Sequence, residues 1–584
     1  MTSTGETETT GTGSVPPPGQ PAWQKTLKRY GPIAAVAVLI VGAVLVFGGG
    51  GGGGDDEDEA STTGDATEEE LIRSGPMTPE RAELEGVEVD FGESCDPDLG
   101  RIELVSVYAP PCVEPFDGDN GGATSAGVTA DEITVVYYQA DPELDPLAAA
   151  TATDAGVQID ADSGRQTVQD FVDLYNKLFE GYGRTIVVEG YTGTGAASDT
   201  EAARRDAIAI AEKDPFAVIG GPAQSSAVFA GELASRGIIC GPGCAAALNE
   251  DLVTELEPYV WQSSTTPNQS SALAAELIGN LAGPGKAEMA GDEAIREQDR
   301  VYGLLHYDTP DGDHQPVFEA LKTALADNGI DLATDVEFTL DLATAQENAR
   351  THIGKLMEAG VTTVIYYGDP LTPSSLTAEA TAQGYFPEWI LGPSTLMDTT
   401  LFARRTDGDQ WQNGFGMSLV GARGATETNG AFQIYEWAYG TEPPNTNVNV
   451  LEPYLRTVFT GVHLAGPELT PETFRDGLLR YPVSGGGPTE VQVSRGDHGV
   501  WPDFDWGGTD DVAIIWWDPA ATGEDEVGNE GTGMYRYANG GERYTIGDLP
   551  TSPEEAGLFD VDSSVVVFDE VPEEDRTPDY PPPA

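Results

Sequence analysis

Basic residues are scarce in this sequence, and its charge balance is strongly acidic. Lysine and arginine together number 29 against 98 aspartate and glutamate residues, which gives a formal net charge of −69 over 584 residues. Nucleic-acid phosphates and anionic lipid headgroups are negatively charged, so such a surface repels both. We therefore expect no nucleic-acid partner and interpret the acidity as a solvated surface suited to salty or acidic surroundings.

The sequence also lacks the short motifs that mark common hydrolases and nucleotide-binding enzymes. It contains no GxSxG, HExxH, GxxxxGK[ST] or SxxK pattern. The histidines have no neighbouring motif and are scattered: His306, His314, His352, His463 and His498. A serine or cysteine triad would have to be assembled from residues without a local signal. We expect a protein that is not an enzyme and that holds no cofactor.

Cysteine is rare, and the four residues fall into two local pairs. Cys95 pairs with Cys112, and Cys240 pairs with Cys244. An even number of cysteines in an exported chain predicts disulfides, and both pairs are expected to be oxidised. Zinc is the competing interpretation, but neither pair has CxxC spacing and no histidine lies near in the sequence. We expect no metal site.

No apolar run reaches the ~20 residues typical of a membrane-spanning helix. The longest candidate extends from Ile33 to Phe47, follows Lys25, Lys28 and Arg29, and precedes glycines and acids. This order predicts a transmembrane anchor at residues 31–50, with a cytoplasmic N-terminus and an extracellular main body in the cell membrane. A cleaved signal peptide is the alternative, although no small-x-small site adjoins the run. Lipidation is not expected, because the first cysteine is Cys95.

Composition divides the rest of the chain into flexible ends and a body too long for one core. We expect disorder in residues 1–30, a Gly-rich and acidic linker with a disulfide loop at 51–120, and a disordered acidic tail at 548–584. The body is expected to form two lobes, the first from residues 121–263 and 412–483, the second from 264–411 and 484–547.

Short β-branched runs alternate with amphipathic segments through the body, which predicts βα units. Expected strands of the first lobe are residues 133–138, 185–188, 216–219 and 238–240, and those of the second include 301–305, 361–367 and 389–391. The predicted fold class is α/β, with two Rossmann-like parallel-sheet lobes joined by a hinge that the chain crosses several times. A cleft between hinged lobes is the expected ligand site.

Two glycine-containing turns follow predicted strands of the first lobe. In the turn from Gly220 to Ser226, glycines permit close approach, and free N–H groups at the following helix start can bind a carboxylate or hydroxyl. Ser225 or Ser226 could instead simply cap that helix. The turn from Gly241 to Ala245 follows the next predicted strand in the same way. Asp311 follows the strand at 301–307, so it is expected to face the same cleft.

The order of these segments resembles the solute-binding proteins of branched-chain amino acid and amide ABC transporters, which have the type I periplasmic binding fold. The resembling stretches cover roughly residues 120–545 and include FAVIGGPAQSS (216–226), ASRGIICGPGCAAALN (234–249), VTTVIYYGDP (361–370) and WILGPSTLMD (389–398). The resemblance implies that a solute favours the closed state of the lobes, which ABC permease subunits then recognise.

The resemblance also implies ligand-binding residues. The turns that bind a ligand carboxylate in that family match Gln224, Ser225, Gly243, Cys244 and Ala245 here. In the second lobe, Asp311 and Ser394 occupy places where amino-acid binders have a tyrosine and an acid. Asp369 is a possible substitute for the missing acid as partner of an ammonium group. The solute class therefore stays open among amino acids, amides, carboxylates and other small polar solutes.

A sensory receptor is the main alternative to an importer. The same ectodomain could report a ligand across the membrane, although residues 1–30 leave no room for an output domain. Neighbouring genes for a permease and an ATPase would favour the importer.

Overall fold

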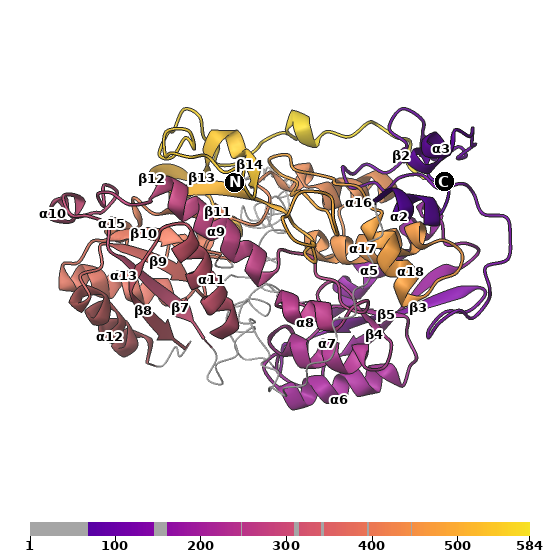
Figure 1. Cartoon of the computed structure of the whole chain (residues 1–584), viewed down its shortest axis with the longest axis horizontal. Helices are drawn as coiled ribbons and strands as arrows, with labels where there is room; N and C mark the ends of the chain where they lie inside the picture. Colours follow the sequence, from indigo (N-terminus) through magenta and orange to yellow (C-terminus); the bar gives the residue numbers. More distant parts are fainter. Residues whose placement is uncertain are drawn as a thin grey trace, which may run out of the picture.

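The computed structural model describes residues 68–144, 160–246, 248–308, 315–339, 344–393, 396–445 and 447–583. These residues form two lobes, each built on its own β-sheet (Figure 1). The predicted cytoplasmic segment 1–30 and the predicted anchor 31–50 lie outside the described residues. Within the described ranges, no helix is long and apolar enough to cross a membrane.

The sheet of lobe 1 has the order β4-β3-β5-β6, and all of its neighbouring strands are parallel. Strands β3, β5 and β6 are largely buried because helices cover both faces of the sheet, whereas only Ile186 is buried on the edge strand β4. The strands match the predicted positions closely: β3 (Glu132–Gln139), β4 (Thr185–Thr192), β5 (Ala217–Ile219) and β6 (Ile239–Cys240).

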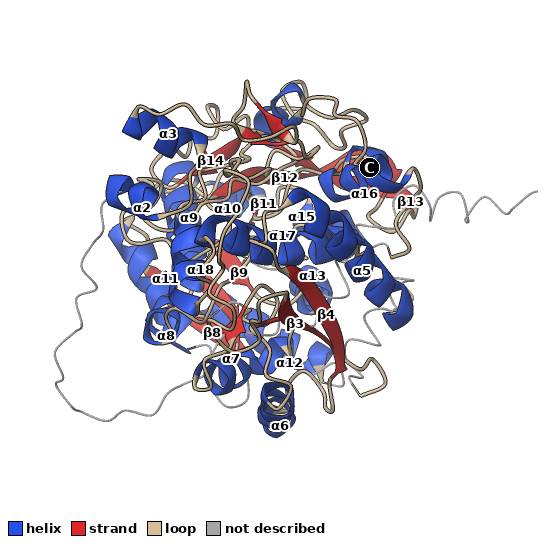
Figure 2. Ribbon diagram, turned by 90° about the vertical axis from the view of Figure 1, so that its right-hand side faces the viewer, coloured by secondary structure: helices blue, strands red, loops and turns tan. Residues whose placement is uncertain are grey.

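Helices from two distant parts of the chain cover the sheet of lobe 1. In both views α6 and α7 lie on one side of β3 and β4, and α5, α16 and α17 lie on the other (Figures 1 and 2). One buried cluster joins residues 102–261 to residues 431–478. The helices are α5 (Ala161–Leu178), α6 (Thr200–Ala211), α7 (Ser226–Ala234), α8 (Glu250–Glu255), α16 (Gly430–Tyr439), α17 (Val448–Ala465) and α18 (Pro471–Leu479).

The sheet of lobe 2 is mixed. Its order is β13-β12-β11-β10-β9-β7-β8, with β14 also paired to β12. The parallel part consists of β7 (Tyr302–Tyr307), β8 (Leu332–Phe338), β9 (Thr363–Tyr367), β10 (Glu388–Leu391) and β11 (Phe415–Ser418). The antiparallel part consists of β12 (Asp511–Glu524), β13 (Glu530–Tyr537) and β14 (Arg543–Thr545). The prediction of a purely parallel sheet is therefore wrong for this lobe.

Two buried clusters lie on the two faces of the lobe 2 sheet. Helices α9 (Pro267–Leu281) and α11 (Gln315–Asp327) pack on one face. The other face is covered by α12 (Ala345–Glu358), α13 (Thr372–Gln383), α14 (Thr400–Ala403) and α15 (Gly408–Trp411). The short α10 (Glu293–Arg296) lies at the outer edge.

The chain passes between the lobes in segments 262–266, 419–429 and 480–510, named here the first, second and third crossings. They lie side by side, since Ala422 N–H donates to Pro488 O at 2.8 Å and Gly508 N–H donates to Ser264 O at 3.0 Å. The predicted boundary between residues 411 and 412 is wrong. β11 pairs with β10 and β12, so residues 412–418 belong to lobe 2.

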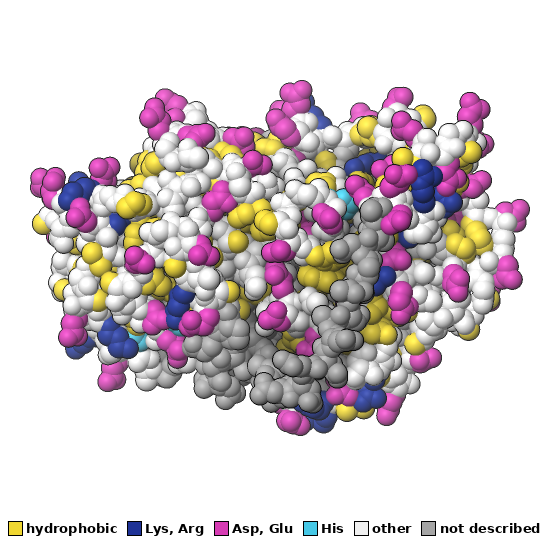
Figure 3. Space-filling model, in the orientation of Figure 1, with side chains coloured by type: hydrophobic (Ala, Val, Ile, Leu, Met, Phe, Trp, Pro, Cys, Tyr) yellow, Lys and Arg dark blue, Asp and Glu magenta, His cyan; other side chains and the backbone are white. Residues whose placement is uncertain are grey.

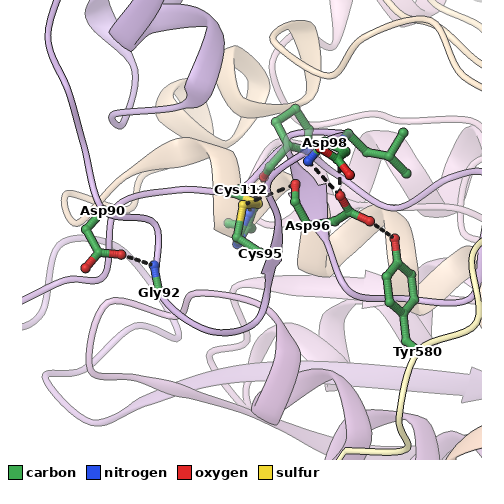
Figure 4. Close-up of a disulfide and its surroundings, with 10 residues drawn as sticks. Asp90, Gly92, Cys95, Asp96, Asp98, Cys112 and Tyr580 are labelled. Atoms are coloured by element: carbon green, nitrogen blue, oxygen red, sulfur yellow. Dashed lines mark hydrogen bonds between the residues drawn. A yellow bond between two sulfur atoms is a disulfide. The ribbon is translucent and has the colours of Figure 1, made fainter.

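Residues 68–116 form an ordered segment on lobe 1, named here the N-terminal cap, and not the flexible linker that composition suggested. It contains α2 (Glu68–Ser74), α3 (Pro79–Glu85), β1 (Cys95–Asp96) and β2 (Arg101–Ile102). Both predicted disulfides are confirmed, and Cys95–Cys112 closes the loop of the cap (Figure 4). Ile102 and Leu104 join the lobe 1 core, so apolar burial together with the disulfide holds this segment.

The tail, residues 548–583, is also ordered, which contradicts the prediction of disorder. Leu549, Ala556 and Leu558 are buried in a core cluster of lobe 2. The Tyr580 hydroxyl then reaches Asp96 of the cap. An acidic composition misled the prediction because a few apolar residues are enough to fix a segment on cores formed elsewhere in the chain.

Acidic side chains are spread over the visible face of both lobes and do not gather in one patch (Figure 3). This distribution agrees with a solvated acidic surface.

Candidate functional site

The two predicted turns of lobe 1 meet at the carboxyl end of its sheet. Gly220 N–H donates to Pro242 O at 3.0 Å, which ties the turn after β5 to the turn after β6. A side chain on Gly221 would fall 2.9 Å from the Cα of Cys244, so glycine is required for this close approach. The sequence thus placed both turns at one edge correctly.

Ser225 and Ser226 use their hydroxyl hydrogens within the protein. Ser225 Oγ donates to Ala197 O at 2.9 Å, and Ser226 Oγ donates to Ala246 O at 3.0 Å. Neither hydroxyl caps α7, because no side chain accepts from the first N–H groups of that helix. The capping alternative is therefore wrong. Both side chains are almost fully buried, whereas Gln224 is partly exposed.

The turn after β6 is fixed by its own backbone. The N–H groups of Cys244 and Ala245 both donate to Gly241 O, at 3.1 and 3.2 Å. Cys244 is bonded to Cys240, and the side chains of Cys244 and Ala245 are buried. Gly243 has φ +75°, and an added Cβ would lie 2.3 Å from the ring of Tyr454. The N–H donors assigned to a ligand carboxylate at Cys244 and Ala245 are thus already engaged in the turn.

A polar group that the sequence did not indicate lies at the same edge. Tyr137 and Gln139 end β3, and Gln139 Oε1 accepts from Arg165 Nη1 at 2.6 Å. Gln139 Nε2 lies 3.5 Å from the Tyr137 hydroxyl. Tyr454, on α17, covers Gly243 and is partly exposed. The position of Tyr137 near the end of a predicted strand was a sequence signal for this residue. Tyr454 lies in a helix, and no sequence signal marked it.

Both phenols are neutral near physiological pH. Burial raises the pKa of Tyr137 to about 12, although its bond to Gln139 opposes the rise. Burial, reinforced by Tyr137, raises the pKa of Tyr454. These hydroxyls can therefore form hydrogen bonds but carry no charge there.

In lobe 2, Asp369 follows β9 directly, but local structure uses both of its oxygens. Asp369 Oδ1 accepts from the N–H groups of Leu371 and Thr372, both at 2.8 Å, and Oδ2 accepts from Thr372 Oγ1 at 2.6 Å. Burial raises the pKa of this carboxyl, and these hydrogen bonds oppose the rise. Asp369 thus holds the start of α13, and its role toward an ammonium group stays a prediction. Asp311 and Ser394 lie outside the described residues.

The carboxyl ends of both sheets adjoin the first crossing. In lobe 1, Trp261 N–H donates to Cys240 O at 3.0 Å, so the end of β6 lies beside the residue that precedes the crossing. In lobe 2, Tyr367 at the end of β9 contacts Ser270, which lies in the first turn of α9 after the crossing. Because open α/β sheets bind ligands at the carboxyl ends of their strands, these edges together form the candidate site.

This chain is similar in structure to solved proteins. No protein-family model and no curated protein matches this chain. One similar solved structure is an ABC transporter solute-binding protein from R. palustris in complex with 4-hydroxybenzoate, with 12% identity, a TM-score of 0.48, and coverage of 72% of this chain and 98% of that one.

Two further structures belong to the same class. An ABC transporter substrate-binding protein from Aeropyrum pernix has 12% identity and a TM-score of 0.49, covering 73% of this chain and 99% of that one. The branched-chain amino acid binder LivJ from Streptococcus pneumoniae, in complex with isoleucine, has 14% identity and a TM-score of 0.43, covering 69% and 99%.

The solved structures similar to this chain are thus ABC transporter substrate-binding proteins, the class that the sequence resemblance names. The chain's own two-lobed, mixed α/β architecture fits the type I periplasmic binding fold.

Proposed function

We propose that this protein is the extracellular solute-binding receptor of an ABC importer and that it captures a small polar solute between its lobes. The observation that carries the proposal is the meeting of two parallel-sheet edges at the first crossing. Ligand sites of α/β proteins lie at such edges, and a site shared by two lobes is suited to closure around a solute. An amino acid, an amide or a carboxylate fits the polar groups described above.

The mechanism requires the solute to bind the closed form more tightly than the open form. A solute with equal affinity for both forms would shift nothing, however tightly it bound. Tyr137, Gln139 and Tyr454 are the groups of lobe 1 that we assign to the solute, because they adjoin the turns after β5 and β6. Permease subunits would then recognise the closed form.

We further propose that residues 31–50 anchor the receptor in the cell membrane, with the lobes outside. The Gly-rich and acidic residues that follow this run support a flexible, hydrated tether. A tether of this kind keeps a receptor near its permease at high effective concentration.

A thermal-shift screen of the full-length protein tests the proposal. Amino acids, amides, ureas and small carboxylates are the panel, since a bound solute stabilises the folded state by about 2.7 kcal/mol at 100 times its Kd. Tyr137→Phe and Tyr454→Phe are expected to weaken the shift. Tyr439→Phe, which changes an exposed tyrosine of α16, is the matched control. A panel without any shift, together with hydrolysis of a chromogenic ester or peptide, would overturn the transport function.

A further inference from the structure

The tail leaves lobe 2 and runs back over the crossings to lobe 1. In Figure 1 this yellow segment follows the upper edge of the molecule from β14 toward the C-terminus, which lies by α16 in Figure 2. Val565 pairs with Tyr537 of β13 through two backbone hydrogen bonds, at 2.8 and 3.0 Å. The first half of the tail is thus fastened to the lobe 2 sheet.

The tail then binds the second and third crossings. Phe568 N–H donates to Arg423 O at 2.8 Å, and Ala425 N–H donates to Phe568 O at 2.9 Å. Farther along, Asp575 Oδ2 accepts from the N–H of Thr489 at 2.8 Å and from its hydroxyl at 2.7 Å. These contacts fix the tail to chain segments that would have to bend when the lobes move.

The last contacts of the tail are on lobe 1 and its cap. Trp437 of α16 donates through Nε1 to Tyr580 O at 2.9 Å. The Tyr580 hydroxyl donates to Asp96 Oδ2 at 2.8 Å (Figure 4). This bond lowers the pKa of the Asp96 carboxyl, so the acceptor is charged at neutral pH. Asp96 itself follows Cys95, whose disulfide to Cys112 holds the loop in place.

A pocket beneath the tail marks where these segments meet. Its lining includes Val105 of the cap, Thr428 of the second crossing, Glu490 of the third crossing, and Asp575 of the tail. The cap and two crossings, three segments that are far apart in the sequence, therefore meet under one stretch of the tail.

We propose that residues 565–580 act as a strap that restrains the movement of the two lobes relative to each other. The strap supplies a further connection between the lobes, fastened by hydrogen bonds and not by covalent continuity. Beyond lobe 2, Asp575 accepts two hydrogen bonds from Thr489 of the third crossing, and Tyr580 bonds to Trp437 of lobe 1 and Asp96 of the cap. These polar contacts can open without unfolding a lobe. This proposal rests on the proposed function, in which the two lobes move about a hinge.

Spin-label distances between the lobes in the absence of solute test the strap. Ile208 of α6 and Met357 of α12 are exposed positions on different lobes and far from the tail, so Ile208→Cys and Met357→Cys provide the labelling sites. The native cysteines are all in disulfides, which keeps labelling selective. Pulsed electron–electron double resonance on the full-length chain then gives the distribution of interlobe distances.

Two alterations open the strap in different ways. A chain that ends at Asp569 keeps the tail residues buried in lobe 2 but loses Asp575 and Tyr580. The full-length double variant Asp575→Ala with Tyr580→Phe removes only the side-chain fastenings and keeps the bond from Trp437 to the backbone oxygen of residue 580. A chain that ends at Tyr580 and the exposed substitution Asp569→Ala are the matched controls.

We expect the distance distribution to broaden in the truncated chain and in the double variant, and to stay narrow in both controls. Melting temperatures confirm that each protein is folded. If the truncated chain does not fold, the double variant alone tests the strap. A distribution in the folded, altered proteins that is identical to the wild type would overturn the strap. That result would leave solute capture intact, because capture is measured separately by thermal shift.

Discussion

At the scale of single residues, local hydrogen bonding decides what a side chain can offer a ligand. Sequence position alone placed Ser225, Cys244 and Asp369 at strand ends, and the structure confirms that placement. The sequence could not show that their donors and acceptors are used by neighbouring backbone, because these partners depend on turn geometry. Tyr454 shows the reverse case, since only tertiary packing brings this helical residue over Gly243.

Asp369 should be more important for stability than an ordinary surface acid. Asp369→Ala removes the acceptor of two N–H groups at the start of α13, which should cost about 1–2 kcal/mol of unfolding free energy. Asp369→Asn keeps an oxygen acceptor and should recover most of that loss. Denaturant unfolding of the two variants measures the difference, and equal losses would contradict the capping role. An unchanged solute affinity in Asp369→Asn would remove this residue as an ammonium partner.

His463 should make the protein sensitive to acid. Its Nδ1 accepts from Glu180 N–H at 2.8 Å, and its Nε2 lies 2.9 Å from Pro111 O. Burial lowers the pKa of His463 to about 4, so the folded state binds this proton more weakly than the unfolded state, in which the pKa is near 6.5. Stability is therefore full above about pH 6.5 and declines by about 3 kcal/mol as pH falls toward 4.

Unfolding free energies of the wild type and His463→Gln between pH 7.5 and 4.5 measure this contribution. The variant should show a shallower decline. Some decline should persist, because burial also lowers the pKa of His306 to about 4. Identical pH dependence in both proteins would contradict the assignment.

At the scale of elements, short buried strands were predictable and their pairing direction was not. Runs of Val and Ile gave β3, β5 and β6 within a few residues because these strands are buried, and a similar run gave the start of the edge strand β4. The antiparallel pairing of β12 with β11 and β13 depends on where distant strands lie, which local periodicity does not encode.

Substitution by alanine should destabilise the protein at Gly243, in a turn, but not at Gly231, in helix α7. Gly243→Ala places a Cβ against the Tyr454 ring at a backbone φ of +75°, and we expect a loss of about 1–3 kcal/mol and a weaker solute-induced shift. Gly231 of α7 has open space around it, so Gly231→Ala is the matched control and should gain about 0.5–1 kcal/mol. Thermal unfolding of both variants measures these effects. A tolerated Gly243→Ala would show that the turn is not tightly fitted.

At the scale of the whole molecule, the division into two lobes followed from chain length and from the repeated βα pattern. The ordered structure of the N-terminal cap and of the tail did not follow from the sequence. Tyr580 and Asp96 are 484 residues apart in the sequence, and no local feature announces their contact. Composition describes the average solvation of a segment, whereas order in the cap and the tail comes from a disulfide and from contacts with cores built by other segments.

In the function that we propose, a small polar solute closes the two lobes. This closure is tested by the interlobe distance between labels at Ile208 and Met357, recorded with and without a solute that raises the melting temperature. We predict a shorter and narrower distance distribution when the solute is bound. An unchanged distribution at saturating solute would contradict closure of the lobes.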